Sequence, residues 1–568
     1  MKAPSGIFTA GIFTAGTFIA DTFIAACLLF LLSFPLFSLS FNDKGDAGEL
    51  AFRLTAEMSD EQALAQTFML GWVGAEPSPL IMNWIRDRNI GGVKIFGWNT
   101  GDTLKLAETV GELQKNALAS GLGIPLFVAT DQEGGLVRHV KGATSETPGN
   151  MAIGASGRPM DAYWSGYYIG KELALLGINM NFAPTVDLFT NRDSTLIGPR
   201  SFGADPVRAG ILGAAFAKGQ MESGVIATAK HYPGHGDTDL DSHGVLPRIE
   251  VPFEQLWDRE LLPYRMLAKE DLPAVMSGHL AFPKTEAGET PASLSPWFIT
   301  GILKEKIAYK GIIITDDLMM NGATAYAGSL SRAAKQALVA GNDIIMLSKT
   351  PFLYDPVWSY LISSMKEEPE FRERVRDACR RILATKLEYL RGEKKVPYLP
   401  DMGKIEAGLT DPESAAFFLS LAARSVTIVD NKNVFPLDPA KAGSVLLAGG
   451  FPDFFNYGRK AFPGASTYWF NSPSDAEALV ARARNADTVI FCLWNRNSQR
   501  VLERLRSLNK RIIVFSVLSP VYLEEASWAD GAVAVYSYAT ESFIAGFSAI
   551  LGRIPGSGKL PFPLQSRP

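Results

Sequence analysis

Eight short apolar runs alternate with longer amphipathic stretches between residues 50 and 390, and this alternation restricts the fold more than any other feature. The runs span residues 68–73, 92–96, 126–131, 180–187, 225–231, 274–280, 312–318 and 343–347. Helical periodicity separates them, for example at 103–120 and 206–223. Because strands that alternate with helices form parallel sheets, the pattern predicts an α/β fold, a TIM-type (β/α)8 barrel over residues 50–390. An open doubly wound sheet is the alternative, but it rarely holds this many parallel strands.

The pattern changes after residue 390. Residues 391–410 are rich in glycine, proline and charge, which is typical of a linker. Six further apolar runs predict a smaller α/β sandwich with a mostly parallel sheet over residues 411–568. A chain of 568 residues exceeds the usual size of one hydrophobic core, so two domains also agree with its length.

Composition excludes several classes of protein. The chain is 47% hydrophobic and 20% charged, as expected for an ordinary folded protein. Its net charge of -4 argues against a nucleic-acid partner, because binding to phosphates requires a basic surface. The three cysteines (Cys27, Cys379 and Cys492) support neither a disulfide framework nor a cysteine-based zinc site.

Residues 1–41 resemble a targeting segment. One basic residue, Lys2, precedes a degenerate five-residue repeat, and residues 25–37 are almost wholly apolar. This order is typical of a signal peptide, or of an uncleaved membrane anchor. We therefore expect export to the periplasm or the cell exterior, with cleavage near residues 38–41 or retention at the membrane.

Ionisable side chains follow five of the eight predicted strands. In a TIM barrel the carboxyl ends of all strands meet at one face, where active sites lie. The pattern therefore predicts one catalytic cluster at that face. Its candidate members are Asp131, Glu133, Asp187, Lys230, His231, His279, Asp316 and Asp317.

Three of the five histidines fall in the segment 230–243, KHYPGHGDTDLDSH. The Pro-Gly pair between His231 and His235 forbids the helix on which this spacing would bind a metal. The acidic repeat that begins at Asp237 lacks the glycine and the glutamate that an EF-hand requires. We therefore expect no metal and no cofactor. A serine nucleophile is also disfavoured, because the chain has no G-x-S-x-G motif.

Carbohydrate chemistry fits these residues better. A retaining glycosidase needs a carboxylate nucleophile and a separate proton donor. Asp316 follows an apolar strand that would hold it rigidly, and Asp317 is the fallback. His243 can donate and accept a proton near neutral pH, and Asp241 stands two residues earlier to orient its imidazole.

Several sequence strings together resemble one enzyme family. In chain order they are DQEGG, NFAPTVDL, IGPRSFGADP, KHYPGHGDTDLDSH, MSGHLAFP and ITDDLMM. They are similar to glycoside hydrolase family 3, and within it to the NagZ-type β-N-acetylglucosaminidases. The resemblance covers residues 55–390, and the GSGKLP ending at 556–561 is similar to the close of the family's second domain.

The resemblance implies a cofactor-free, retaining exo-β-N-acetylglucosaminidase. Such an enzyme hydrolyses terminal β-linked GlcNAc from peptidoglycan fragments or chitin oligosaccharides through a glycosyl-enzyme intermediate. Its partner is a small oligosaccharide or muropeptide. The N-terminal segment is similar to that of the exported two-domain members.

The resemblance also implies individual roles. Asp316 would be the nucleophile, His243 the acid/base and Asp241 its partner. The residues expected to bind the sugar in the -1 subsite are Asp131, Arg200, Lys230 and His231. The family commonly places a sugar-binding arginine eight residues beyond the aspartate that corresponds to Asp131. Here that position is His139, so either Arg138 substitutes for the arginine or the contact is lost.

Two other functions remain open at this point. One is a phosphorylase with the same nucleophile and histidine, because a histidine repels phosphate less than a carboxylate does. The other is a non-catalytic muropeptide-binding protein. Such a protein would have no need to keep Asp316, Asp241 and His243 together.

Overall fold

A computed structural model describes residues 1, 39–239 and 244–565 of the chain. Eight parallel strands close into a barrel with the strand order β1-β10-β9-β8-β7-β6-β3-β2. Each predicted apolar run overlaps one barrel strand, so the predicted TIM-type barrel is confirmed. The strands are β1 (Phe68–Gly71), β2 (Gly92–Ile95), β3 (Phe127–Thr130), β6 (Met180–Asn181), β7 (Ile226–Tyr232), β8 (Ala274–Ser277), β9 (Ile312–Asp317) and β10 (Ile344–Leu347).

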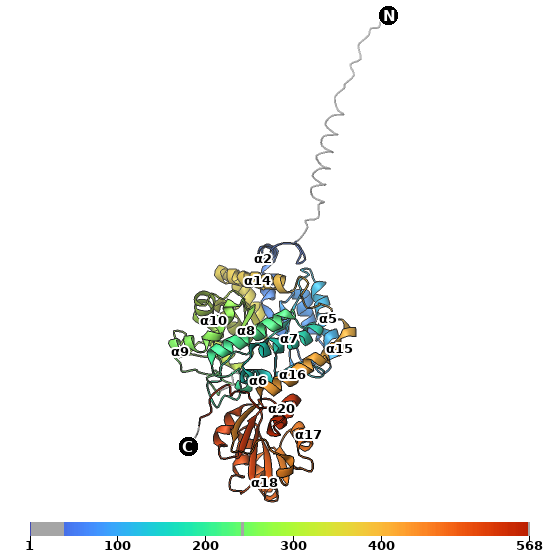
Figure 1. Cartoon of the computed structure of the whole chain (residues 1–568). Coiled ribbons are helices and arrows are strands. Elements are labelled where there is room, and N and C mark those ends of the chain that lie inside the picture. Colours follow the sequence, from blue (N-terminus) through green and yellow to red (C-terminus); the bar gives the residue numbers. More distant parts are fainter. Residues whose placement is uncertain (2–38, 240–243, 566–568) are drawn as a thin grey trace.

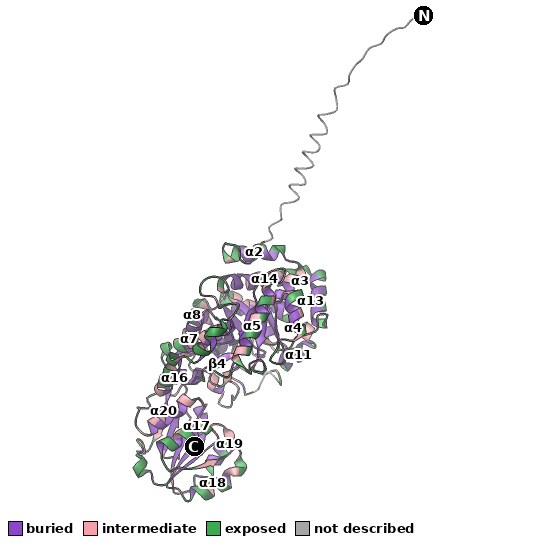
Figure 2. Cartoon of the chain, turned by 90° about the vertical axis from the view of Figure 1, so that its right-hand side faces the viewer, coloured by how far each residue is buried: buried purple, intermediate pink, exposed green. Residues whose placement is uncertain are grey.

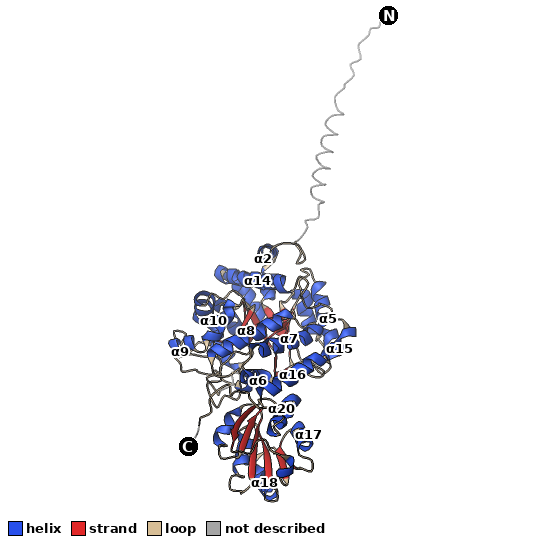
Figure 3. Ribbon diagram, viewed as in Figure 1, coloured by secondary structure: helices blue, strands red, loops and turns tan. Residues whose placement is uncertain are grey.

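Helices surround the barrel on its outside (Figure 3). Helix α8 shows how the sequence determines where such a helix begins. Pro206 occupies its first turn, and the Asp205 side chain accepts hydrogen bonds from two backbone amides. The longer helices are α2 (Ala47–Glu57), α5 (Thr103–Leu118), α7 (Pro159–Leu175), α8 (Pro206–Glu222), α10 (Leu261–Lys269), η5 (Trp297–Lys306), α12 (Leu330–Ala340), α13 (Pro356–Glu367) and α14 (Pro369–Tyr389). Shorter ones are α3 (Asp60–Gln66), α4 (Pro79–Asn83), η1 (Trp84–Arg88), α6 (Gly149–Ser156), α9 (Phe253–Asp258) and α11 (Asn321–Ala327).

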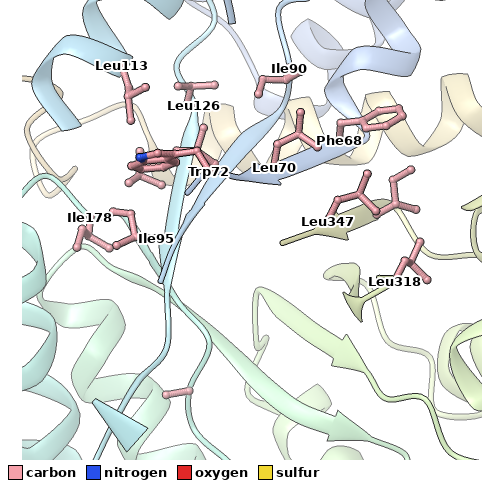
Figure 4. Packing of buried hydrophobic residues seen from close by; sticks show 14 of the residues in the cluster. Phe68, Leu70, Trp72, Ile90, Ile95, Leu113, Leu126, Ile178, Leu318 and Leu347 are labelled. Carbon is pink, nitrogen blue, oxygen red and sulfur yellow. The ribbon is translucent and has the colours of Figure 1, made fainter. Parts of the chain in front are cut away.

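Alternation along the strands separates two packed regions. Phe68 and Leu70 of β1 belong to the apolar layer between strands and helices, which Figure 4 shows. The intervening Met69 belongs to another cluster, with Phe127 and Met180 of neighbouring strands. Because successive side chains point to opposite faces of a strand, this second cluster fills the inside of the barrel.

The second domain has a six-stranded sheet with the order β11-β16-β15-β14-β12-β13. All neighbouring strands are parallel except β11, which runs antiparallel to β16, and this confirms the predicted mostly parallel sheet. The strands are β11 (Thr427–Asn431), β12 (Val445–Gly449), β13 (Ser466–Trp469), β14 (Thr488–Leu493), β15 (Arg511–Ser516) and β16 (Gly531–Ala534). The helices include α17 (Pro452–Ala461), α18 (Ala476–Ala483), α19 (Arg496–Glu503) and α20 (Thr540–Ile550).

Residues 391–410, which we predicted as a linker, pack against the barrel. Val396, Ile405 and Leu409 are buried in the same apolar cluster as the barrel helices, and α15 (Ile405–Leu409) contacts α7. The following helix α16 (Pro412–Ser425) belongs to both domains: Phe418 is part of the barrel cluster, and Ala422 is part of the second domain's core. The connection is therefore anchored to the barrel at a few buried apolar side chains.

The second domain lies at the end of the barrel opposite to α2 (Figures 1 and 2). Its contacts involve the loop that follows β6: Arg192 forms an ion pair of 2.8 Å with the buried Glu524, and the rings of Phe189 and Phe562 are 4.6 Å apart. The second domain therefore borders the face where the barrel strands end. Among the described helices, none combines the length and the apolar character needed to span a membrane.

Lys386 of α14 is buried at the amino-terminal end of the barrel, and none of the described carboxylates pairs with it. Its Nζ donates a hydrogen bond of 2.9 Å to Oε1 of Gln66 and lies 5.1 Å from the centre of the Phe127 ring. Burial lowers the pKa of Lys386 to about 7 from the ordinary 10.5. Between pH 7 and pH 10.5, Lys386 is therefore mostly protonated in the unfolded chain and mostly neutral in the folded protein.

We expect Lys386→Met to stabilise the protein at pH 7 by about 2 kcal/mol, because it removes a poorly compensated buried amine. The gain should shrink as the pH rises from 7 towards 10.5, where the unfolded lysine also loses its proton. Thermal unfolding at several pH values measures this, with the exposed Lys366→Met as the control. A gain that does not vary with pH would contradict the assignment.

Candidate active site

A cavity of about 520 Å³ opens where the barrel strands end. Most of its charged wall comes from the ends of β2, β3, β7 and β9, and one residue comes from the turn η3 (Gly198–Arg200). The polar lining consists of Lys94, Asp131, Glu133, His139, Arg200, Lys230, His231, His235, Asp316, Asp317 and Ser348. The site residues predicted as Asp131, Arg200, Lys230, His231 and Asp316 thus lie around one space.

The cationic and anionic groups of this wall alternate. Asp131 forms a 2.7 Å ion pair with Lys94 through Oδ2, and Lys230 pairs with its other oxygen. Lys230 also contacts Glu133 at 2.6 Å, and Glu133 receives two hydrogen bonds, of 2.7 and 2.9 Å, from the guanidinium of Arg200. Bidentate geometry of this kind makes a strong and directional pair. The network fixes all five side chains relative to one another.

The network keeps both carboxyl groups ionised. Burial alone would raise the pKa of Asp131, but the ammonium groups of Lys230 and Lys94 hold it well below its usual range. In the same way, Arg200 and Lys230 outweigh the burial of Glu133 and lower its pKa to about 2. The cavity therefore presents fixed charges that can bind the hydroxyl groups of a ligand.

His231 is oriented by a buried aspartate. Its Nδ1 lies 2.7 Å from Oδ2 of Asp187, and its Nε2 lies 3.4 Å from Arg200. Asp187 also accepts hydrogen bonds from the backbone amides of His231 and His235. A proton on Nδ1 satisfies the aspartate and leaves the Nε2 lone pair on the cavity side. Asp187, whose role the sequence left open, therefore positions His231.

Asp316 and Asp317 at the end of β9 have different surroundings. Oδ1 of Asp317 accepts hydrogen bonds of 3.0 Å from the backbone amides of Met319 and Ser348. Within the described residues, the Asp316 carboxylate accepts a single hydrogen bond, from the amide of Asp317, and it lines the cavity. Burial opposes ionisation of Asp316, but His231, the backbone amide of Asp317 and Lys230 keep its pKa below the ordinary value. Asp316 is thus the available carboxylate, and Asp317 braces the loop.

His279 supports this strand end from behind. Its Nε2 lies 3.0 Å from the carbonyl oxygen of Asp317, and its Nδ1 lies 2.7 Å from the Ser293 hydroxyl. Donation by Nε2 to the carbonyl leaves Nδ1 to accept from the hydroxyl, which corresponds to a neutral imidazole. Burial lowers the pKa of His279 and agrees with that state. His279 therefore fixes the backbone that carries Asp316.

Arg138 does not reach the cavity. Its guanidinium donates to the carbonyl oxygen of Thr144 at 2.6 Å and to Glu146 at 2.9 Å. The cavity is lined instead by the neighbouring His139, whose Nδ1 is 3.7 Å from Asp131. The structure therefore does not bring Arg138 together with the other predicted sugar-binding residues.

Two features of the wall were not predicted. Phe96 and Trp98 stack with ring centres 4.4 Å apart and form an apolar side of the cavity, and half of Trp98 is exposed. Aromatic faces of this kind suit the C–H surface of a sugar ring. Among the described residues His235 has no hydrogen-bond partner for either ring nitrogen, although it is buried in the cavity wall.

Lys94 is the third unpredicted member. It occurs inside the apolar run 92–96, where only its place in the strand alternation distinguishes it from a solvent-facing lysine. The predicted acid/base His243 and its partner Asp241 lie outside the described residues. Within the part of the chain that the structure describes, no group of three or more His, Cys, Asp or Glu residues has the arrangement of a metal site.

We expect Glu133→Gln to destabilise the protein by about 3 kcal/mol at pH 7, because Arg200 and Lys230 lose a buried partner charge. The ionic contribution of Glu133 is present above pH 4.5 and disappears as the pH falls towards about 2, so the difference from wild type should narrow there. Melting temperatures at pH 7 and pH 4 test this, with the exposed Glu373→Gln as the control. Equal melting temperatures for all three proteins at pH 7 would contradict a structural role for this pair.

Comparison with known proteins agrees with this arrangement. Residues 62–385 match the glycosyl hydrolase family 3 N terminal domain. The chain is 36% identical over 285 residues to beta-hexosaminidase A of Pseudoalteromonas piscicida, covering 47% of this chain and 47% of that protein. It is also 36% identical over 266 residues to a beta-hexosaminidase of Tolumonas auensis, covering 46% of this chain and 76% of that protein.

A solved structure extends the likeness to both domains. It is a glycoside hydrolase family 3 beta-N-acetylglucosaminidase from Paenibacillus sp. str. FPU-7, with a TM-score of 0.80 and 28% identity. The match covers 90% of this chain and 100% of that one. The chain thus spans the whole of this relative, but about half the length of the Pseudoalteromonas protein. Because the family domain extends over more than half of its residues, the chain belongs to glycoside hydrolase family 3.

Proposed function

We propose that this protein is a retaining exo-β-N-acetylglucosaminidase. It would release terminal β-linked GlcNAc from peptidoglycan fragments or chitin oligosaccharides. The observation that carries the proposal is the placement of Asp316. It is an available carboxylate in a cavity that is also lined by a network of charged side chains held in place by one another. The hexosaminidase relatives and the related β-N-acetylglucosaminidase structure support the choice of sugar.

Sugar binding is assigned to the charged network. Asp131 and Glu133 can accept hydrogen bonds from hydroxyl groups, whereas Arg200 and Lys230 can donate to hydroxyl or carbonyl oxygens. All four are held by one another, so they bind without first losing conformational freedom. Phe96 and Trp98 offer an apolar face for the ring.

In the first step the carboxylate of Asp316 forms a bond to the anomeric carbon while the bond to the leaving oxygen breaks. His243, oriented by Asp241, gives its proton to that oxygen. In the second step His243 removes a proton from water, the water oxygen bonds to the anomeric carbon, and Asp316 is released. Two displacements on the same carbon retain its configuration.

We infer that the chain is exported. The support is the composition of residues 1–41, a basic residue followed by an apolar segment. Phe41 is buried in the same apolar cluster as Leu50 and Leu54 of α2, and Leu39 packs against that cluster. The N-terminal sequence of the protein recovered from cell fractions tests cleavage and location together.

The central test is hydrolysis of p-nitrophenyl β-N-acetylglucosaminide by wild type, Asp316→Ala and His243→Ala. We expect Asp316→Ala to lose at least about 10³-fold in kcat, since no covalent intermediate can form. His243→Ala should lose less with this activated leaving group, because nitrophenolate leaves without a proton. Azide should restore turnover in Asp316→Ala and give the α-glycosyl azide, which identifies the nucleophile.

Asp317→Asn is the matched control at the neighbouring carboxylate. If it loses more activity than Asp316→Ala, the two aspartates exchange roles. Wild-type activity on the β-glucoside alone would mean that the sugar is wrong. Formation of GlcNAc-1-phosphate in phosphate buffer would instead identify a phosphorylase, and tight muropeptide binding without turnover would identify a binding protein.

A further inference from the structure

Lys94 occupies an unusual position inside the barrel. It belongs to β2, and its side chain is 1% exposed. Its Nζ lies 4.4 Å from the centre of the Phe96 ring and 5.4 Å from that of Phe182, with the apolar interior beneath it. An ammonium group inside a barrel is unfavourable unless a negative charge compensates it. The position therefore requires an explanation beyond packing.

The compensating charge is Asp131, the predicted sugar-binding aspartate. Lys94 holds Oδ2 at 2.7 Å, and Lys230 holds Oδ1 from the other side of the barrel. Lys94 also donates a hydrogen bond of 2.8 Å to the carbonyl oxygen of Ile95, which fixes the ammonium at the end of its own strand. Two cations from different strands thus determine how the Asp131 carboxylate is turned.

His139 could in principle supply the same charge, because its Nδ1 is 3.7 Å from Oδ2 of Asp131. Its Nδ1 also lies 3.4 Å from Nζ of Lys94, so the neutral ring can accept a hydrogen bond from the ammonium. Burial and the nearby Lys94 and Lys230 lower the pKa of His139 to about 4, although Asp131 opposes this. The nearer partner of Oδ2 is therefore Lys94, at 2.7 Å against 3.7 Å for His139.

We propose that Lys94 is a positioning residue for the glycosidase site: its ammonium locks the Asp131 carboxylate in the orientation that accepts the sugar hydroxyls. This inference rests on the proposed function for its substrate, but the Lys94–Asp131–His139 arrangement itself does not. Lys94 acts through Asp131. Removing it leaves the carboxylate present but free to turn towards Lys230 alone.

We expect Lys94→Met to lower kcat/KM for the N-acetylglucosaminide by about 10–100-fold, with the larger part in KM, because substrate binding loses a fixed acceptor. The double variant Lys94→Met/His139→Arg should recover much of this loss, since an arginine at 139 lies within reach of the same oxygen. Lys386→Met is the matched control: it removes another buried lysine, in α14 at the amino-terminal end of the barrel, and should leave kcat/KM unchanged.

A purely structural role for Lys94 predicts a different result. Lys94→Met would then alter the melting temperature in proportion to any loss of activity, and His139→Arg would not restore KM. Unchanged kinetics in Lys94→Met would overturn the proposal directly. A well-folded Lys94→Met with raised KM, restored in the double variant, would establish it.

The titration of His139 provides a measurement that does not depend on activity. NMR of histidine-labelled full-length protein resolves five histidines, and a His139→Gln variant assigns the signal. We expect the pKa of His139 to rise in Lys94→Met, because Asp131 then faces it with one cation fewer. An unchanged titration would overturn the arrangement. If wild type hydrolyses no glycoside while this shift is observed, the proposed function fails and the role of Lys94 in orienting Asp131 stands.

Discussion

Lys230 is the group on which the mouth of the barrel depends. Its buried ammonium bridges Asp131 and Glu133, and so ties the end of β7 to the segment that follows β3. Glu133 then passes the constraint to Arg200 in η3. In a medium of low dielectric constant each of these buried charges requires its partners. Loss of one member therefore leaves an uncompensated buried charge and destabilises the folded protein. The same requirement that stabilises it also fixes its geometry before any ligand arrives.

Strand geometry places the other reacting groups around this network. Lys94, Asp131, Lys230 and Asp316 are far apart in the sequence, but each stands at or near the carboxyl end of a strand with its side chain towards the barrel axis. The groups around Asp316 hold the pKa of its carboxyl below the ordinary value, although burial opposes this. The site thus joins an anionic carboxylate to a wall of fixed donors and acceptors, which is the electrostatic arrangement a glycosidase needs.

The second domain contributes to the same end of the molecule. A smaller cavity, of about 200 Å³, lies between the two domains, with Leu136 and Pro199 on the barrel side and Trp494 and Tyr522 on the other. Val137 and Arg200, the next residues along the chain, line the main cavity. The ion pair of Arg192 with Glu524 and the shared helix α16 hold the domains in this relation.

Sequence alone determined the eight strands, the mostly parallel second sheet, the family, and a set of ionisable residues at strand ends. Hydrophobic periodicity indicates which face of an element is buried, and short motifs indicate chemistry. Both can therefore be recognised without a structure. Tertiary structure decided which of these groups meet. It showed that Arg138 lies away from the cavity, and that Asp187 and His279 hold other site residues in place. It also distinguished Asp316 from Asp317 by their hydrogen bonds. It also revealed the role of Lys94. A buried lysine needs a partner charge, and here the partner, Asp131, follows a different strand, so neither segment of sequence alone predicts the pair.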